Sequence, residues 1–168
     1  MSAYAAPPAA PTAAPHVAEP PPPWQFAPHG PVLVDGGPLL ALFNAGDDWH
    51  ARVLTWLQQH PGMALVSTWP VLTEVCALLA RRVHNQAALD FLLWAERGGL
   101  RVDTPDESSL PHMRRVAQRF ASLPLDLADA SIAEAAERLG LRHILSVDAD
   151  FDVYRDGRGR PLTNLLRS

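Results

Sequence analysis

The segment VLVDGGP, residues 32–38, decides the fold class of this chain. A short aliphatic run that ends in an acidic residue, two glycines and a proline is typical of a buried strand leading into a tight turn. Similar strand candidates follow at residues 64–67, 100–104 and 143–147, with helical segments between them. Because strands that alternate with helices form a parallel sheet covered on both faces, we expect a three-layer α/β/α domain whose central parallel sheet has four to five strands.

The helices are predicted from apolar spacing and from residues that favour helix ends. Thr68, followed by Pro70, and Asn85 are typical N-cap residues, and Gly140 is a typical C-cap residue. We expect helices over residues 39–44, 49–59, 69–82, 85–98, 106–122 and 126–139.

The composition indicates one domain preceded by an extension. The chain has 168 residues, of which 48% are hydrophobic, and this is enough for one core. Residues 1–31 are dominated by alanine and proline, so we expect a disordered or polyproline-like extension before a domain at residues 32–168. No apolar run approaches the roughly 18–20 residues that span a bilayer, and the first residues lack the pattern of a signal peptide, so we expect a cytoplasmic protein without membrane contact.

The charge of the chain opposes a broad attraction to nucleic acid. The formal net charge is −4, and all 14 basic residues are arginine. A negative field repels RNA, so any contact with RNA has to be local, where arginines cluster and bind phosphate. The candidate clusters are Arg81 with Arg82, Arg114 with Arg115 and Arg119, and Arg155 with Arg158 and Arg160.

Acidic residues stand where an open parallel sheet binds ligands. Asp35 and Asp148 directly follow strand candidates, and the carboxyl ends of parallel strands share one edge. Glu74 lies in an apolar stretch of the helix predicted at 69–82, where a buried charge needs a partner or an ion. Asp126 and Asp129 are three residues apart at a helix start, near the positive end of the helix dipole.

Carboxylates that converge repel one another, and Mg²⁺ or Mn²⁺, which prefer oxygen ligands, commonly offset that repulsion. Such an ion also supports phosphodiester hydrolysis. Each acid has a structural alternative as well. These alternatives are a turn residue for Asp35 and Asp148, a solvent-facing helix position for Glu74, and a helix cap for Asp126 or Asp129. Asp150 and then Asp152 rank lower, because an Asp-rich turn is commonly a solvated surface.

Other chemistries lack their motifs in this sequence. No serine lies in a Gly-x-Ser-x-Gly elbow, and there is neither a phosphate-binding loop nor a dinucleotide glycine pattern. The seven histidines show no zinc-type pairing, and the single cysteine, Cys76, excludes an internal disulfide.

Four motifs in order resemble those of PIN-domain proteins, especially the VapC-type toxins: VDGGPLLALF at 34–43, LTE at 72–74, LDLADAS at 125–131 and LSVDADF at 145–151. The resemblance covers residues 32 to about 166. It implies an endoribonuclease that depends on Mg²⁺ or Mn²⁺ and acts as the toxin of a type II toxin–antitoxin pair. It further implies an RNA substrate, a cognate antitoxin and a homodimer.

The resemblance also implies roles for individual residues. The catalytic acids are Asp35, Glu74, Asp129 and Asp148, and the metal ligands are Asp35, Asp129 and Asp148, with Asp126 as an extra acid and Asp150 as a companion of the last motif. One departure is Gly36, where the family usually has Ser or Thr. Two alternatives stay open: a PIN-like binding module with weakened chemistry, and a housekeeping RNA-processing nuclease without an antitoxin.

Overall fold

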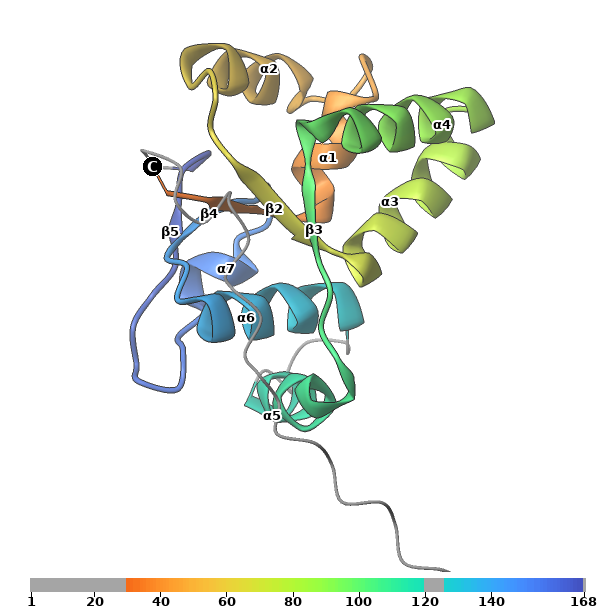
Figure 1. Cartoon of the computed structure of the whole chain (residues 1–168). Helices are drawn as coiled ribbons and strands as arrows, with labels where there is room; N and C mark the ends of the chain where they lie inside the picture. The colour runs from red at the N-terminus through yellow and green to blue at the C-terminus, as the bar shows by residue number, and fades with distance from the viewer. Residues whose placement is uncertain (1–29, 120–125, 168) are drawn as a thin grey trace, which may run out of the picture.

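The computed structural model describes residues 30–119 and 126–167, and within them the chain forms one five-stranded, wholly parallel sheet (Figure 1). The strands are β1 (Val32–Val34), β2 (Leu65–Thr68), β3 (Arg101–Asp103), β4 (His143–Leu145) and β5 (Thr163–Asn164), in the spatial order β3-β2-β1-β4-β5. The predicted extension at residues 1–31 lies, except for its last two residues, outside the described part of the chain.

Helices cover both faces of the sheet. They are α1 (Gly36–Leu42), α2 (His50–Gln59), α3 (Trp69–Arg82), α4 (Asn85–Trp94), α5 (Leu110–Arg119), α6 (Leu127–Leu139) and α7 (Asp150–Val153), with a π-helical turn η2 (Ala95–Gly99) and a 3-10 turn η3 (Glu107–Ser109). In Figure 1, α1, α2 and α4 lie above the sheet, and α6 and α5 lie below it. The three-layer α/β/α prediction is confirmed.

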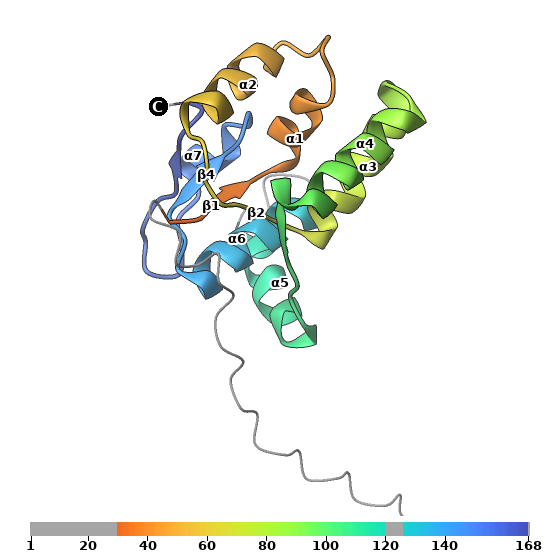
Figure 2. The same ribbon diagram turned by 45° about the horizontal axis from the view of Figure 1, so that its top comes forward.

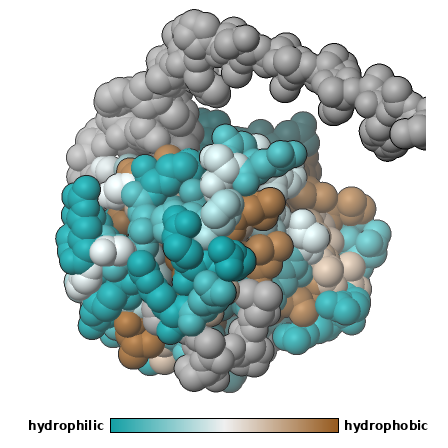
Figure 3. Space-filling view, turned by 90° about the horizontal axis from the view of Figure 1, so that it is seen from below, coloured by the Kyte–Doolittle hydropathy of each residue, from teal (hydrophilic) through white to brown (hydrophobic). Residues whose placement is uncertain are grey.

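The core sits between these layers. Leu33, Val66 and Ile144, at the centres of three neighbouring strands, are all 0% exposed, as a sheet covered on both faces requires. Helix α6 is buried on almost every side because it packs against the sheet on one face and against α5 on the other. Helices α3 and α4 form a packed hairpin beside α1 (Figure 2). Seen from below, the face that carries α5 is mostly hydrophilic (Figure 3).

The N-cap predicted for α4 is wrong, whereas the position of the N-cap predicted for α3 is confirmed. His84, not Asn85, is the N-cap of α4, because its Nδ1 accepts the backbone N–H of Ala87 at 3.0 Å. Thr68 occupies the N-cap position of α3, but its hydroxyl lies 2.5 Å from the Ser131 hydroxyl and makes no capping bond. The C-cap prediction for Gly140 is confirmed, since that residue has a φ of 69°.

Other differences concern element boundaries. The segment predicted as one helix over 106–122 begins with the 3-10 turn η3, and its last residues lie outside the described chain. Helix α7 and strand β5 were not predicted, because four and two residues are too few to produce a periodic pattern. None of the helices described is long and apolar enough to span a membrane.

Candidate active site at the carboxyl edge of the sheet

Asp35 is fixed at the end of β1, where the strand turns into α1. Its side chain is only 7% exposed, and its Oδ1 accepts the backbone N–H of Gly36 at 2.6 Å, so it is also the N-cap of α1. Strand β4 lies directly beside β1 in parallel, and Asp148 follows its end. The structure therefore places both strand-end acids on one edge, as the sequence predicted.

One buried hydroxyl connects these two strand ends. Ser146 Oγ donates to Asp35 Oδ2 at 2.9 Å and accepts the backbone N–H of Asp148 at 3.0 Å. Ser146 is itself 0% exposed. Because a buried carboxylate oxygen with a fixed donor cannot rotate freely, Ser146 restrains the orientation of the Asp35 side chain. Sequence reasoning missed this role, although Ser146 stands two residues before an acid in the LSVDADF motif.

The last strand holds Ser146 in place. Asn164, on β5, donates from its side-chain nitrogen to the Ser146 carbonyl at 3.0 Å, and its side-chain oxygen accepts the Ser146 backbone N–H at 3.3 Å. The same oxygen accepts the N–H of Leu166 at 3.2 Å. The Asn164 side chain thus takes the place of backbone hydrogen bonds between strands, just beyond the end of β4, and fixes the backbone at Ser146. No signal in the sequence distinguished Asn164 from an ordinary polar residue near the end of the chain.

Helices α3 and α6 bring the remaining acids to the same edge. Glu74 lies on α3 so close to α1 that its Oε2 would be 3.5 Å from a Cβ at Gly36. Asp126 caps α6 by accepting the N–H of Ala128 at 2.7 Å, and Asp129 lies in the first turn of the same helix. Asp126 therefore caps this helix, as one of its predicted roles required.

The acids lie near enough to one another for their charges to interact. Burial raises the pKa of Asp35 to about 6, and the negative charges of Glu74 and Asp148 add to the rise. Burial likewise raises the pKa of Asp129 to about 7, with further repulsion from Asp35, Asp126, Asp148 and Glu74. At neutral pH this site concentrates negative charge at one end of the sheet.

Glu74 has a distinct environment within the group. Burial and the charge of Asp126 raise its pKa, while the positive charge of Arg82, two turns further along α3, lowers it. Arg82 is exposed and has no hydrogen bond or ion pair among the described residues. The Arg81 and Arg82 pair predicted from sequence therefore includes a free cation on the helix that carries Glu74.

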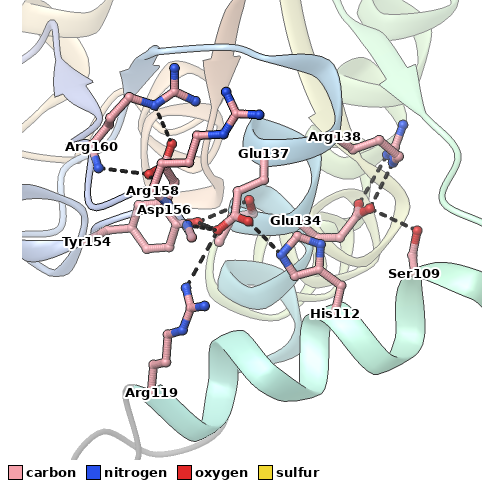
Figure 4. A network of polar contacts seen from close by, with 12 residues as sticks. Ser109, His112, Arg119, Glu134, Glu137, Arg138, Tyr154, Asp156, Arg158 and Arg160 are labelled. Atoms are coloured by element: carbon pink, nitrogen blue, oxygen red, sulfur yellow. Dashed lines mark hydrogen bonds and ion pairs between the residues drawn. The ribbon is translucent and has the colours of Figure 1, made fainter.

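Elsewhere in the described residues, the buried acids and the half-buried Glu137 are each paired with cations. Figure 4 shows much of this second network, between α5, α6 and the loop after α7. The pairs are Arg138 with Asp103 and Glu134, His112 and Arg119 with Glu137, and Arg142 and Arg160 with Asp156. In contrast, across residues 30–119 and 126–167 no ion pair involves Asp35, Glu74, Asp126, Asp129 or Asp148. Asp35 is thus the one buried acid of the described residues without a cation, and it lies among other unpaired carboxylates, which points to an external cation at this edge.

The lower-ranked candidates take separate positions. Asp150 begins α7, and its backbone N–H donates to Asp148 Oδ1 at 3.0 Å. Asp152 pairs instead with Arg167 at 3.0 Å. Two arginines of the predicted C-terminal cluster also make internal contacts, Arg160 with Asp156 and Arg155 with backbone carbonyls.

The donor chemistry of the edge suits a hard divalent ion. The acids offer only carboxylate oxygens, the ligands that Mg²⁺ and Mn²⁺ prefer. In the part of the chain that the structure covers, no three Asp, Glu, His or Cys side chains already converge into a ready set of metal ligands. An ion would therefore have to draw the carboxylates closer together than their mutual repulsion holds them.

Comparison with known proteins agrees with this geometry. The family model of the PIN domain matches residues 32–157, so the chain belongs to the PIN-domain family. A curated relative, ribonuclease VapC26 of Mycobacterium tuberculosis, is 26% identical over 117 residues, covering 70% of this chain and 86% of VapC26. A crystal structure of VapC20 from Mycobacterium tuberculosis, described as a toxin that cleaves the sarcin-ricin loop, superposes with a TM-score of 0.66 at 22% identity, covering 72% of this chain and 92% of that one. The second likeness supports the fold.

Proposed function

We propose that this chain is a metal-dependent endoribonuclease that hydrolyses RNA phosphodiester bonds at the carboxyl edge of its sheet. The observation that carries the proposal is the buried, unpaired Asp35 among further carboxylates that lack an ion pair, whereas the other buried acids of the described residues are paired. Membership of the PIN-domain family and the name of the relative VapC26 support the choice of RNA.

In this proposal Asp35, Asp129 and Asp148 hold Mg²⁺ or Mn²⁺. Asp126 adds a fourth carboxylate, and Asp150 contributes more weakly from α7. When bound, the ion offsets the charge of the substrate phosphate and makes water a better nucleophile at neutral pH. Ser146 restrains the Asp35 carboxylate through its hydrogen bond of 2.9 Å, so that the rearrangement on ion binding falls mainly on the other acids.

Glu74 is assigned to the attacking water. It lies beside α1, next to the acids rather than between the strand ends, and its pKa is raised above the ordinary value by burial. A carboxylate with a raised pKa accepts a proton more readily, which suits a group that orients water and takes its proton. Arg82, on the same helix, supplies positive charge for the approaching RNA backbone.

Gly36 does not prevent this chemistry. A Cβ at Gly36 would meet Glu74 Oε2 at 3.5 Å and Val75 Cγ2 at 3.6 Å, which are ordinary contact distances, so the position has space for a small side chain. The hydroxyl that the family usually places there is absent. Ser146 supplies a buried hydroxyl to Asp35 from the opposite side.

We further propose that the nuclease is the toxin of a type II toxin–antitoxin pair, that it forms a homodimer and that a cognate antitoxin inhibits it. The relative VapC20 is described as a toxin, which supports this biological setting. Co-expression with a neighbouring small gene product should relieve growth arrest caused by this chain alone. A housekeeping nuclease would neither arrest growth nor need such a partner.

The test is cleavage of total bacterial RNA by the purified chain with Mg²⁺ or Mn²⁺. We expect discrete fragments that disappear in EDTA and with Asp35→Asn. Asp48→Asn removes the same charge from an exposed position before α2 and serves as the matched control, which should cleave normally. A folded protein that leaves RNA intact with either ion would refute the nuclease and favour a binding module.

A further inference from the structure

We propose that Trp69 is a stacking platform for one nucleobase of the RNA substrate, close to the bond that is cleaved. The inference rests on the proposed function and adds a contact through which the site binds its substrate. Among the large apolar side chains of the described residues that are exposed, Trp69 is the sole aromatic one, at 53%. Aromatic rings that stay open to solvent beside a nucleic-acid site commonly stack on unpaired bases.

The register of the sheet places Trp69 beside the acids. Leu33 pairs with Val66, so Asp35, two residues on, stands level with Thr68, and Trp69 follows as the first residue of α3. Neighbouring strands are about 4.8 Å apart, so the backbone of Trp69 lies roughly 6 Å from that of Asp35. The backbone of Trp69 is thus one strand away from Asp35, and its indole ring extends from there toward the end of β3.

The ring points away from Glu74 and along the edge of the sheet. Trp69 Nε1 donates to Thr104 Oγ1, just after β3, at 3.3 Å. Glu74 lies on the β1 side of α3, near Gly36. The indole is thus held at its polar atom, and much of its surface stays open. An RNA strand that crosses Asp148 and Asp35 along this edge reaches Trp69 next.

Charge explains why a stacking contact is needed. The chain has a formal net charge of −4, and the edge itself is lined by carboxylates, so the field around the site repels RNA. Base stacking on an aromatic ring does not depend on charge, and it holds an unpaired base whatever its sequence. Trp69 provides such a contact on the strand next to that of Asp35.

The test measures RNA affinity in an Asp35→Asn background, which keeps the RNA uncut. The probe is a short single-stranded RNA that spans a cleavage site mapped with the wild-type enzyme. Adding Trp69→Ala should weaken binding by about 5- to 100-fold, the range for loss of one stacked base. Trp69→Phe keeps a ring but loses the bond to Thr104, and it should restore affinity to within about 3-fold of the Trp69 protein. Leu89→Ala, which truncates a side chain 50% exposed on α4, is the matched control and should change nothing.

A second measurement identifies the partner of the ring. An abasic nucleotide placed at successive positions near the cleavage site should weaken binding at one position, and at that position Trp69→Ala should have no further effect. The proposal is overturned if Trp69→Ala binds RNA as tightly as the protein that keeps Trp69, or if Trp69→Phe loses as much affinity as Trp69→Ala. It is also overturned if Trp69→Ala weakens binding at every abasic position. It is also overturned if Trp69→Ala dissolves a dimer while RNA affinity stays unchanged, because the ring then contacts protein. Failure of the wild type to cleave RNA would refute the proposed function as well, whereas cleavage that is indifferent to Trp69 refutes this inference alone.

Discussion

Replacing Asp35 with Asn should abolish cleavage and yet stabilise the metal-free protein at neutral pH. Burial and neighbouring carboxylates raise the pKa of Asp35 from 3.8 to about 6. At a pH above both pKa values, this pKa difference destabilises the fold by about 3 kcal/mol. Asn removes the charge but weakens the hydrogen bonds from Gly36 and Ser146, which costs about 1 kcal/mol. The net stabilisation by Asp35→Asn should therefore be about 2 kcal/mol at pH 8.

The sign of this effect depends on pH. A carboxyl whose folded-state pKa is raised destabilises the fold fully above that pKa, and the penalty disappears as the pH falls from about 6 toward the unfolded value of 3.8. At pH 4 the penalty has fallen to about 0.5 kcal/mol and the weakened hydrogen bonds outweigh it, so the variant should be about 0.5 kcal/mol less stable than the wild type. The wild-type protein without metal should correspondingly lose stability as the pH rises from 4 to 7.

Urea unfolding in EDTA at pH 4 and pH 8, followed by circular dichroism, measures both values. Asp48→Asn should match the wild type at each pH. Added Mg²⁺ should then stabilise the wild type, by about 2.7 kcal/mol at a concentration 100 times its Kd, and leave the Asp35 variant unchanged. If Asp35→Asn lowers stability by the same amount at both pH values, Asp35 carries no electrostatic penalty and the reasoning about the site is wrong.

Three further changes test other parts of the structure. Ser146→Ala should lower Mg²⁺ affinity and cleavage by about 10- to 100-fold, while Ser146→Thr retains both. Equal activity of the wild type and the two variants would show that Ser146 does not position Asp35. Gly37→Ala should destabilise the fold by about 1–3 kcal/mol, because a Cβ there would lie 2.3 Å from Val147 Cγ2. Gly36→Ala should be tolerated. If thermal unfolding showed Gly36→Ala to be the less stable variant, it would contradict the packing of α1. Arg138→Met leaves the buried carboxylates of Asp103 and Glu134 without a cation, so the free energy of unfolding should fall by about 3 kcal/mol. RNA cleavage should persist at low temperature, where the variant stays folded. An unchanged unfolding curve would show that these ion pairs do not stabilise the fold.

Much of the site could be predicted because its key residues are tied to the ends of strands. Asp35 and Asp148 follow aliphatic runs, and parallel strands bring such residues to one edge whatever the lengths of the connections. Glu74 could be predicted as part of the site because a charge within an apolar helix segment needs a partner. The alternation of strands and helices was enough for the fold class.

The residues that support these acids could not be predicted, because their roles depend on contacts between distant segments. Asn164 lies on a strand of two residues, and its bonds to Ser146 exist only after β4 and β5 have paired. Arg138 is one arginine among 14, and its partner Asp103 lies on another element of the fold. His84 and not Asn85 caps α4, because the loop geometry, and not residue preference alone, decides which side chain reaches the free N–H groups.

The central claim is that the unpaired acids at the sheet edge bind the ion on which RNA cleavage depends. The most direct measurement is Mn²⁺ binding, by electron paramagnetic resonance or calorimetry, made on the same samples used for RNA cleavage. The samples are the wild type, Asp129→Asn and the surface control Asp48→Asn. We predict that Asp129→Asn loses Mn²⁺ binding and cleavage together, while the control keeps both. Cleavage that persists in Asp129→Asn after its Mn²⁺ binding is lost would contradict the claim.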